Sequence, residues 1–148
     1  MKIKIYTDGA CVGNPGPGGW AAIIIQDNKQ KKISGGENQT TNNRMELTAT
    51  IKALEYCNQK KEEVFAFDKI EVFTDSTYVK QGITVWINSW EKNNWKTTDR
   101  KSVKNIDLWK KLKELTKLNQ IEWHWVKGHS NDPINDLADK LAKEATPI

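Results

Sequence analysis

The chain has 148 residues, of which 37% are apolar and 28% charged, and its net charge is +4. These totals suit one globular domain and exclude a disordered chain or a membrane protein, because no segment approaches the ~20 apolar residues of a membrane span. Residues 1–5 alternate charged and apolar side chains, unlike a signal peptide, and two cysteines are too few for a disulfide framework. We therefore expect a cytoplasmic protein with no membrane contact.

The first third of the chain predicts strands. Residues 2–8 alternate as a strand does, and residues 9–19, with five glycines and two prolines, predict a loop. Residues 20–26 predict a second strand, and residues 31–36 its hairpin partner.

Helices dominate the remainder. We expect a helix over 44–57, a short strand over 70–74, short helices over 76–90, a longer helix over 103–118 and a strand over 121–126. Asp132 and Pro133 have the pattern of an N-cap followed by proline in the first turn, so they predict the start of an amphipathic helix that continues to Ala145. This order predicts a single α/β domain over residues 1–148.

Two predicted strands end on an aspartate followed by a small residue. Asp8 closes the first strand and Asp75 follows the fourth. If these strands are parallel neighbours, both carboxylates emerge at the same edge of the sheet, where α/β proteins build their sites. The alternative is that each aspartate only caps a turn.

Two further carboxylates lie on the inward faces of predicted helices. Glu46 shares a helix face with Ala49 and Ala53, and Asp139 lies at the edge of the last apolar stripe. Glu46 could instead form a capping box with Asn43. Carboxylates gathered without a compensating Lys or Arg repel one another, so the alternative is a site for Mg²⁺ or Mn²⁺. Two such ions can hydrolyse a phosphodiester.

The two histidines have different settings. His124 lies between two tryptophans in a predicted strand and has a structural pattern. His129 follows Gly128 in a polar segment just after that strand. An exposed imidazole beside a metal site suits proton delivery to a leaving group, and the pattern alone fits an ordinary surface histidine equally well.

Four motifs in this order resemble bacterial type 1 ribonuclease H. They are residues 7–19 (TDGACVGNPGPGG), residues 40–47 (TTNNRMEL), residues 74–79 (TDSTYV), and Gly128–His129 with Asn135 and Ala138–Asp139 downstream. Together they span nearly the whole chain, which makes the resemblance far more specific than any one motif.

The resemblance implies a ribonuclease H-like α/β fold. Its sheet has five strands, the first three antiparallel, with helices on both faces. It also implies an endonuclease that hydrolyses the RNA strand of an RNA–DNA hybrid, with two Mg²⁺ ions when substrate is bound and Mn²⁺ as a substitute. By resemblance the metal ligands are Asp8, Glu46, Asp75 and Asp139, and His129 assists turnover.

The resemblance also implies substrate contacts. Asn14, Asn42 and Asn43 match positions that contact the RNA strand, where 2′-hydroxyls distinguish RNA from DNA. Thr41 and Asn105 match a pocket for a DNA phosphate, and Trp86 matches an aromatic residue against a DNA sugar. Two positions depart from the family: Thr77 stands where many members have glutamine, and Ser89 where bacterial members often have asparagine.

Residues 86–104 resemble the basic handle of the bacterial enzymes. Lys92, Lys96, Arg100, Lys101 and Lys104 stand against Glu91 and Asp99, so residues 91–104 carry 5 − 2 = +3. With Trp90 and Trp95 among them, this composition suits a nucleic-acid platform. Alternatively, the tryptophans pack inward and the charges are only solvated.

Two other functions stay open at this stage. One is another nuclease of the ribonuclease H-like superfamily, and the other is a hybrid-binding protein without catalysis. We expect no obligatory protein partner, no separate hybrid-binding domain and a monomer.

Overall fold

The structure is a computed structural model that describes residues 2–63, 69–97, 100–126 and 132–147. Its centre is one five-stranded sheet with the strand order β3-β2-β1-β4-β5. β1 pairs antiparallel with β2 and β2 with β3, whereas β4 is parallel to β1 and β5 is parallel to β4. The strands are β1 (Lys2–Cys11), β2 (Gly16–Gln26), β3 (Lys29–Thr40), β4 (Lys69–Thr74) and β5 (Ile121–Trp125). The predicted mixed sheet is therefore confirmed.

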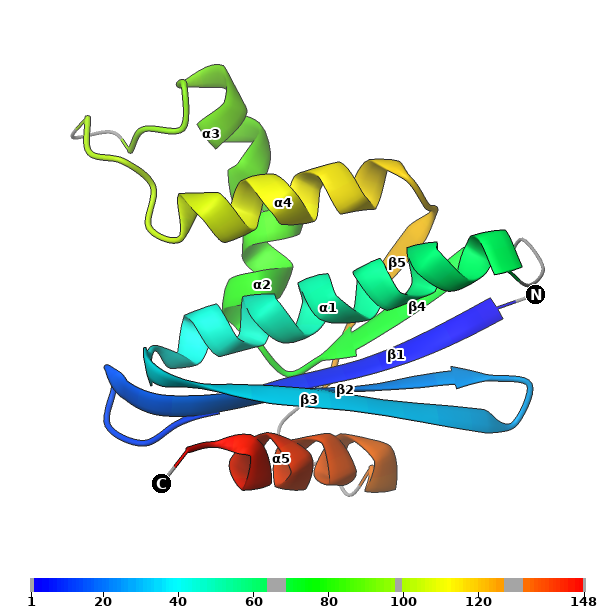
Figure 1. Cartoon of the computed structure of the whole chain (residues 1–148). Helices are drawn as coiled ribbons and strands as arrows, with labels where there is room; N and C mark the ends of the chain where they lie inside the picture. Colours follow the sequence, from blue (N-terminus) through cyan, green and yellow to red (C-terminus); the bar gives the residue numbers. More distant parts are fainter. Residues whose placement is uncertain (1, 64–68, 98–99, 127–131, 148) are drawn as a thin grey trace.

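Helices cover both faces of this sheet (Figure 1). α1 (Asn42–Glu63) lies across one face, and α5 (Pro133–Ala145) lies against β1, β2 and β3 on the other. The chain from α2 (Thr77–Gln81) through a π-helical turn (Gly82–Trp86) to α3 (Ile87–Lys92) forms one column that rises away from the sheet. α4 (Ile106–Lys117) packs between this column and α1.

Two apolar clusters hold these layers together. The larger lies between α1, α4 and the sheet and contains Ile5, Val72, Leu54 and Trp109, all fully buried. The smaller lies under α5 and contains Tyr6, Ile23 and Ala138. Ile5 and Tyr6 are consecutive on β1 and point to opposite clusters, so the strand alternation seen in the sequence places one residue in each layer.

The predicted loop over residues 9–19 is wrong in extent. β1 continues to Cys11 and β2 begins at Gly16, so only residues 12–15 connect them. Gly13 lies in this connection with φ of 66°. Gly9 and Gly18 instead lie inside strands, where other segments approach closely: a Cβ on Gly9 would lie 2.6 Å from the backbone nitrogen of Glu46, and one on Gly18 2.8 Å from the Ala10 carbonyl oxygen. Glycine here marks close packing of the backbone instead of a turn.

Other helices and strands begin or end at residues different from the predicted ones. β3 runs to Thr40 and α1 to Glu63, both longer than expected, and the predicted helix over 103–118 begins only at Ile106. Asn105, just before it, has a left-handed backbone with φ of 60°, which breaks the helical pattern at that point. α5 begins as predicted, since the Asp132 side chain accepts hydrogen bonds from the backbone of Ile134 and Asn135. No helix in the described ranges is long and apolar enough to cross a membrane.

Candidate active site

Three carboxylates meet at the point where β4 ends beside β1. The prediction that Asp8 is the last residue of its strand is wrong, because β1 continues to Cys11. The pairing of Tyr6 with Phe73 and of Thr7 with Thr74 sets the parallel strands in register, so Asp8 and Asp75 follow at the same edge. Glu46 reaches this edge from the start of α1, and one oxygen from each carboxylate lies within 4.8 Å of the others. Asp8 and Glu46 are each only 4% exposed. A pocket of ≈ 380 Å³ joins these residues to Asp139 on α5.

The first turn of α1 explains how Glu46 arrives there. The backbone amide of Arg44 donates to Thr41 Oγ1 at 3.2 Å, so Thr41 caps the helix and Asn43 lies inside it. The alternative that Glu46 is a capping-box partner of Asn43 is therefore wrong. Gly9 lets this turn approach β1, because a side chain there would collide with the backbone of Met45 and Glu46.

When no cation is bound, burial and mutual repulsion favour the protonated, uncharged forms of these carboxylates. Desolvation, followed by the charge of Asp75, raises the pKa of Asp8 from 3.8 to about 7. Desolvation also raises the pKa of Glu46 well above its ordinary value, with the charges of Asp8 and Asp75 adding to the effect. Glu46 Oε2 is buried and has no hydrogen-bond partner among the residues that the structure describes. Such a set of oxygens is costly to ionise alone and is stabilised by a bound cation.

Asp139 differs from the other three carboxylates. It lines the same pocket and shares a side-chain hydrogen bond with Asp8, but it is half-buried and its Oδ2 lies 3.0 Å from Lys143 Nζ, one turn later on α5. The expectation of carboxylates without a compensating base is therefore wrong for Asp139. The pair is a helical i,i+4 neighbour that sequence spacing could have revealed.

The predicted proton carrier, His129, lies outside the described residues. The other histidine, His124, lies on β5 with its ring stacked on Phe73 at 4.8 Å between centroids. It is not among the residues that line the carboxylate pocket.

A second groove of ≈ 730 Å³ shares Asn43 and Tyr78 with the carboxylate pocket. It is lined by most of the residues that the resemblance assigns to substrate contacts and by several residues of the handle. Its lining is Asn14, Thr41, Asn43, Tyr78, Trp90, Thr97, Lys101, Ser102, Val103, Lys104 and Asn105. Asn42 lines the carboxylate pocket, and its backbone amide donates to Asn14 Oδ1 at 2.9 Å. The structure thus brings the three asparagines to one rim.

A polar network that the sequence reasoning missed fixes the floor of this groove. Arg44 Nη1 donates to Asn105 Oδ1 at 3.2 Å, and its guanidinium forms an ion pair with Asp107 at 3.0 Å. The Tyr78 hydroxyl accepts from Asn105 Nδ2 and from Trp109 Nε1, both at 3.1 Å. Arg44 stands inside the TTNNRMEL motif, so its position beside the asparagines was the available signal.

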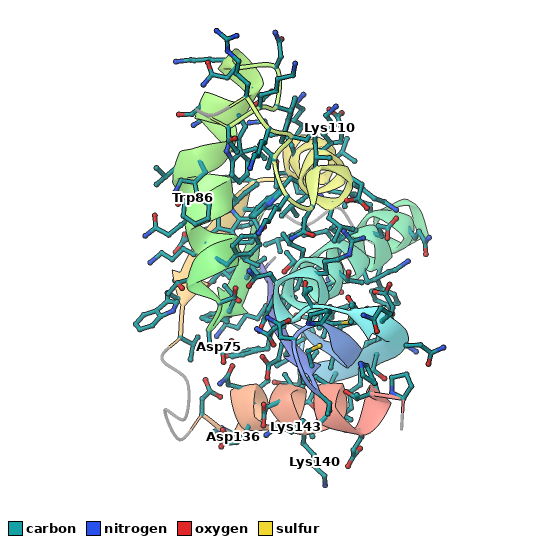
Figure 2. All side chains as sticks on the ribbon, turned by 90° about the vertical axis from the view of Figure 1, so that its left-hand side faces the viewer. Asp75, Trp86, Lys110, Asp136, Lys140 and Lys143 are labelled. Atoms are coloured by element: carbon teal, nitrogen blue, oxygen red, sulfur yellow. The ribbon has the colours of Figure 1, made fainter. Side chains whose placement is uncertain are left out.

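The aromatic residues of the handle divide into two kinds. Trp86 is 38% exposed, and Figure 2 shows it on the outer side of the α2–α3 column, above Asp75. Trp90 and Trp95 are half-buried and pack against the larger cluster, with Trp90 lying 5.4 Å from Trp109. Inward packing therefore describes Trp90 and Trp95, although Trp90 also lines the second groove, whereas Trp86 is the most exposed of the three.

Comparison with known proteins agrees with this arrangement. The chain is 53% identical to a ribonuclease H of Maricaulis maris over 96% of this chain and 91% of the relative. It is 51% identical to a ribonuclease H of Bradyrhizobium diazoefficiens over 96% of this chain and 88% of the relative. The crystal structure of LC9-RNase H1 superposes with a TM-score of 0.84 at 28% identity, covering 97% of this chain and 71% of the other. RNase H1 from Halobacterium salinarum superposes with a TM-score of 0.71 at 27% identity, covering 98% and 97%. The family described as RNase H matches residues 1–146, and the chain belongs to it.

Proposed function

We propose that this protein is an endonuclease that hydrolyses the RNA strand of RNA–DNA hybrids with the help of divalent cations. The observation that carries the proposal is the buried carboxylate cluster opening directly onto a rim of asparagines, Asn42 and Asn43. The relatives named ribonuclease H support the same activity. We also propose one catalytic domain over residues 1–148. The monomeric state and the cytoplasmic location stay predictions.

The proposed metal ligands are Asp8, Glu46, Asp75 and Asp139, holding two Mg²⁺ ions when substrate is bound, with Mn²⁺ as a substitute. The residues fit such ions: the donors are all carboxylate oxygens, three of them lie within 4.8 Å, and the buried Glu46 Oε2 is unpartnered. When bound, the ions would activate a water and stabilise the leaving oxygen of the phosphodiester.

The chain's own residues prepare this site. Because the pKa values of Asp8 and Glu46 are raised, the cluster without a cation binds protons more tightly than free carboxylates do, and cation binding would release them. Asp139 would have to loosen its ion pair with Lys143 to act as a ligand. His129, in the segment after β5, is proposed to carry a proton to the leaving group or to assist product release.

Recognition of RNA is proposed for the asparagine rim. A carboxamide both donates and accepts, so it can bond to a 2′-hydroxyl that a DNA strand lacks. The link from the Asn42 amide to Asn14 Oδ1 holds the loop between β1 and β2 against the start of α1. The three asparagines would therefore contact several consecutive ribonucleotides from one surface, which this hydrogen bond holds together.

A duplex with a single ribonucleotide should consequently be a poor substrate. We expect kcat/KM to fall by roughly 10–100-fold relative to a continuous RNA strand, because each missing hydroxyl contact removes about 1 kcal/mol. Gel assays on duplexes with one, four and many ribonucleotides at a common cleavage position would measure this. Equal cleavage of all three substrates would contradict the roles proposed for Asn14, Asn42 and Asn43.

The DNA strand is proposed to lie along the second groove. Thr41 and Asn105 would hold a phosphate there, supported by the Arg44 guanidinium that already contacts Asn105. Trp86 would lie against a sugar. Lys101 and Lys104 line the same groove from the handle, and Lys92, Lys96 and Arg100 are exposed nearby.

Neutralising four of these charges should weaken binding while the chemistry survives. In the Lys92→Gln, Lys96→Gln, Arg100→Gln, Lys101→Gln variant we expect a higher KM, an almost unchanged kcat and a flatter plot of log K against log salt. Each lost phosphate contact should reduce that slope by roughly 0.7–0.9. The matched control neutralises four exposed lysines away from the groove, Lys29, Lys31, Lys32 and Lys140. Similar salt slopes in both variants would reduce the handle to a surface feature.

One cleavage assay separates the proposed function from its alternatives. A labelled hybrid, duplex RNA and duplex DNA are incubated with and without Mg²⁺. We expect cleavage of the RNA strand of the hybrid, and only when Mg²⁺ is present. Cleavage of duplex DNA would indicate a different nuclease, and binding without cleavage would indicate a hybrid-binding protein.

A further inference from the structure

We propose a second metal site, for a Zn²⁺-type cation, formed by Glu71, Glu122 and His124 on β4 and β5. One ligand atom from each residue lies within 4.8 Å of the others. His124 Nε2 lies 2.9 Å from Glu122 Oε1 and 3.2 Å from Glu71 Oε2, yet it makes a directed hydrogen bond with neither and is itself buried. A buried imidazole nitrogen between two carboxylate oxygens is an arrangement that a cation would complete.

The strand register builds this triad. Glu71 and Glu122 are cross-strand partners in the parallel β4–β5 pair, and His124 follows Glu122 by two residues on the same face. Two residues at i and i+2 on one strand and a third on its neighbour converge above the sheet. α5 lies against the other half of this face, over β1 to β3, so the triad stays accessible: His124 is 33% and Glu122 43% exposed, with Glu71 at 12%.

Ring stacking holds the imidazole of the triad in place. The His124 ring stacks on Phe73 with planes 15° apart, and Phe73 stacks on Tyr6 at 4.6 Å. Tetrahedral Zn²⁺ holds nitrogen and oxygen ligands at about 2.0–2.2 Å, which requires ligand atoms about 3.4 Å apart. The two separations at His124 Nε2 are already close to that value.

The donor set selects the kind of cation. One imidazole and two carboxylates, with a water in the fourth position, suit Zn²⁺, whereas Mg²⁺ prefers oxygen ligands alone. The site is therefore chemically distinct from the carboxylate cluster. Because β5 is the edge strand of the sheet, an ion here would tie that edge to β4.

Two lysines compete with the ion. Lys69 forms an ion pair with Glu122, and Lys2 Nζ lies 3.6 Å from Glu71 Oε1. A bound cation would displace the ammonium of Lys69 from Glu122. Removing the Lys69 ammonium should therefore raise the affinity of the site for the cation. Variants that remove a ligand can only lower this affinity, so the Lys69 variant is an independent test.

The experiment titrates Zn²⁺ into the Asp8→Asn, Asp75→Asn protein in saturating Mg²⁺, which suppresses binding at the carboxylate cluster. The readouts are calorimetry and the imidazole ¹⁵N resonances, which are simple to assign because the chain has two histidines. We expect one Zn²⁺ per chain and a shift of the His124 Nε2 resonance at the first equivalent. His124→Gln should abolish this binding and Glu122→Gln should weaken it at least ~10-fold, whereas Lys69→Gln should tighten it by about 2–5-fold.

Controls separate other ligands and loss of fold. Glu114→Gln removes an exposed carboxylate that pairs with Lys117 on α4 and should leave the affinity unchanged. Cys11→Ser should also leave it unchanged, and Cys57 is buried in the larger apolar cluster. The metal-free melting temperature checks that each variant folds. A Zn²⁺ affinity that is the same in His124→Gln, a shift confined to His129, or no binding at all would overturn the site.

Discussion

Asp8→Asn and Asp75→Asn should each abolish cleavage while leaving the affinity for a hybrid intact or higher. The two carboxylates lie in the pocket with Glu46, and each supplies one of the oxygens that would hold a cation. Loss of metal-assisted stabilisation is worth several kcal/mol, which corresponds to a fall in kcat of roughly 10³-fold or more. Affinity should not fall, because the substitution removes negative charge that faces phosphates.

The matched control is Asp136→Asn, an exposed aspartate in the first turn of α5, on the same end of the molecule as Asp75 in Figure 2. It removes one carboxylate and should leave kcat unchanged. Single-turnover cleavage and hybrid binding in Ca²⁺ would be measured for all three variants. Turnover of Asp8→Asn or Asp75→Asn within a few-fold of the parent protein would contradict the proposed ligands.

Much of this arrangement could be predicted because the periodicity of a strand or helix shows which residues lie on the same face of it. Asp8 lies on an alternating strand and Asp75 directly follows another, so a parallel pairing was enough to bring them together. α5 had a capped start and an apolar stripe, and both survive in the structure. The inward position of Glu46 also followed from helical spacing, even though local capping offered a rival explanation.

Other features depend on contacts between distant segments, which one sequence does not display. The glycines of residues 9–19 looked like a turn, but Gly9 and Gly18 mark places where α1 and β3 press against strands. The link of Arg44 to Asn105 and Asp107 joins residues about sixty positions apart. Register likewise decides that Glu71 faces His124, since β4 and β5 are far apart along the chain.

The stability of the metal-free protein should fall as pH rises from about 4 to about 7. The folded protein holds a proton on Asp8 up to a pKa of about 7, whereas the unfolded chain loses it near the ordinary value of 3.8. The folded state therefore binds more protons than the unfolded state across this window, so deprotonation favours unfolding. Glu46 acts in the same direction, because its pKa is also raised. For Asp8 the difference corresponds to at most about 4 kcal/mol, since one pKa unit is 1.36 kcal/mol.

Asp8→Asn should remove this dependence, because an amide does not ionise. At pH 8 without metal we expect the variant to melt up to roughly 8–16 °C above the parent protein, since 1 kcal/mol shifts the melting temperature of a domain of this size by about 2–4 °C. At pH 4.5 the difference should shrink to about a quarter of this, as the folded parent carboxyl is then protonated and only the unfolded chain is partly ionised. Mg²⁺ at pH 8 should raise the melting temperature of the parent more than that of the variant, because a cation offsets the repulsion among Asp8, Glu46 and Asp75. Scanning calorimetry across this pH range measures all three comparisons. If the melting temperatures of the variant and the parent differed by the same amount at pH 4.5 and pH 8, the variant would act through packing. Ionisation of the carboxylate cluster would then not destabilise the folded protein.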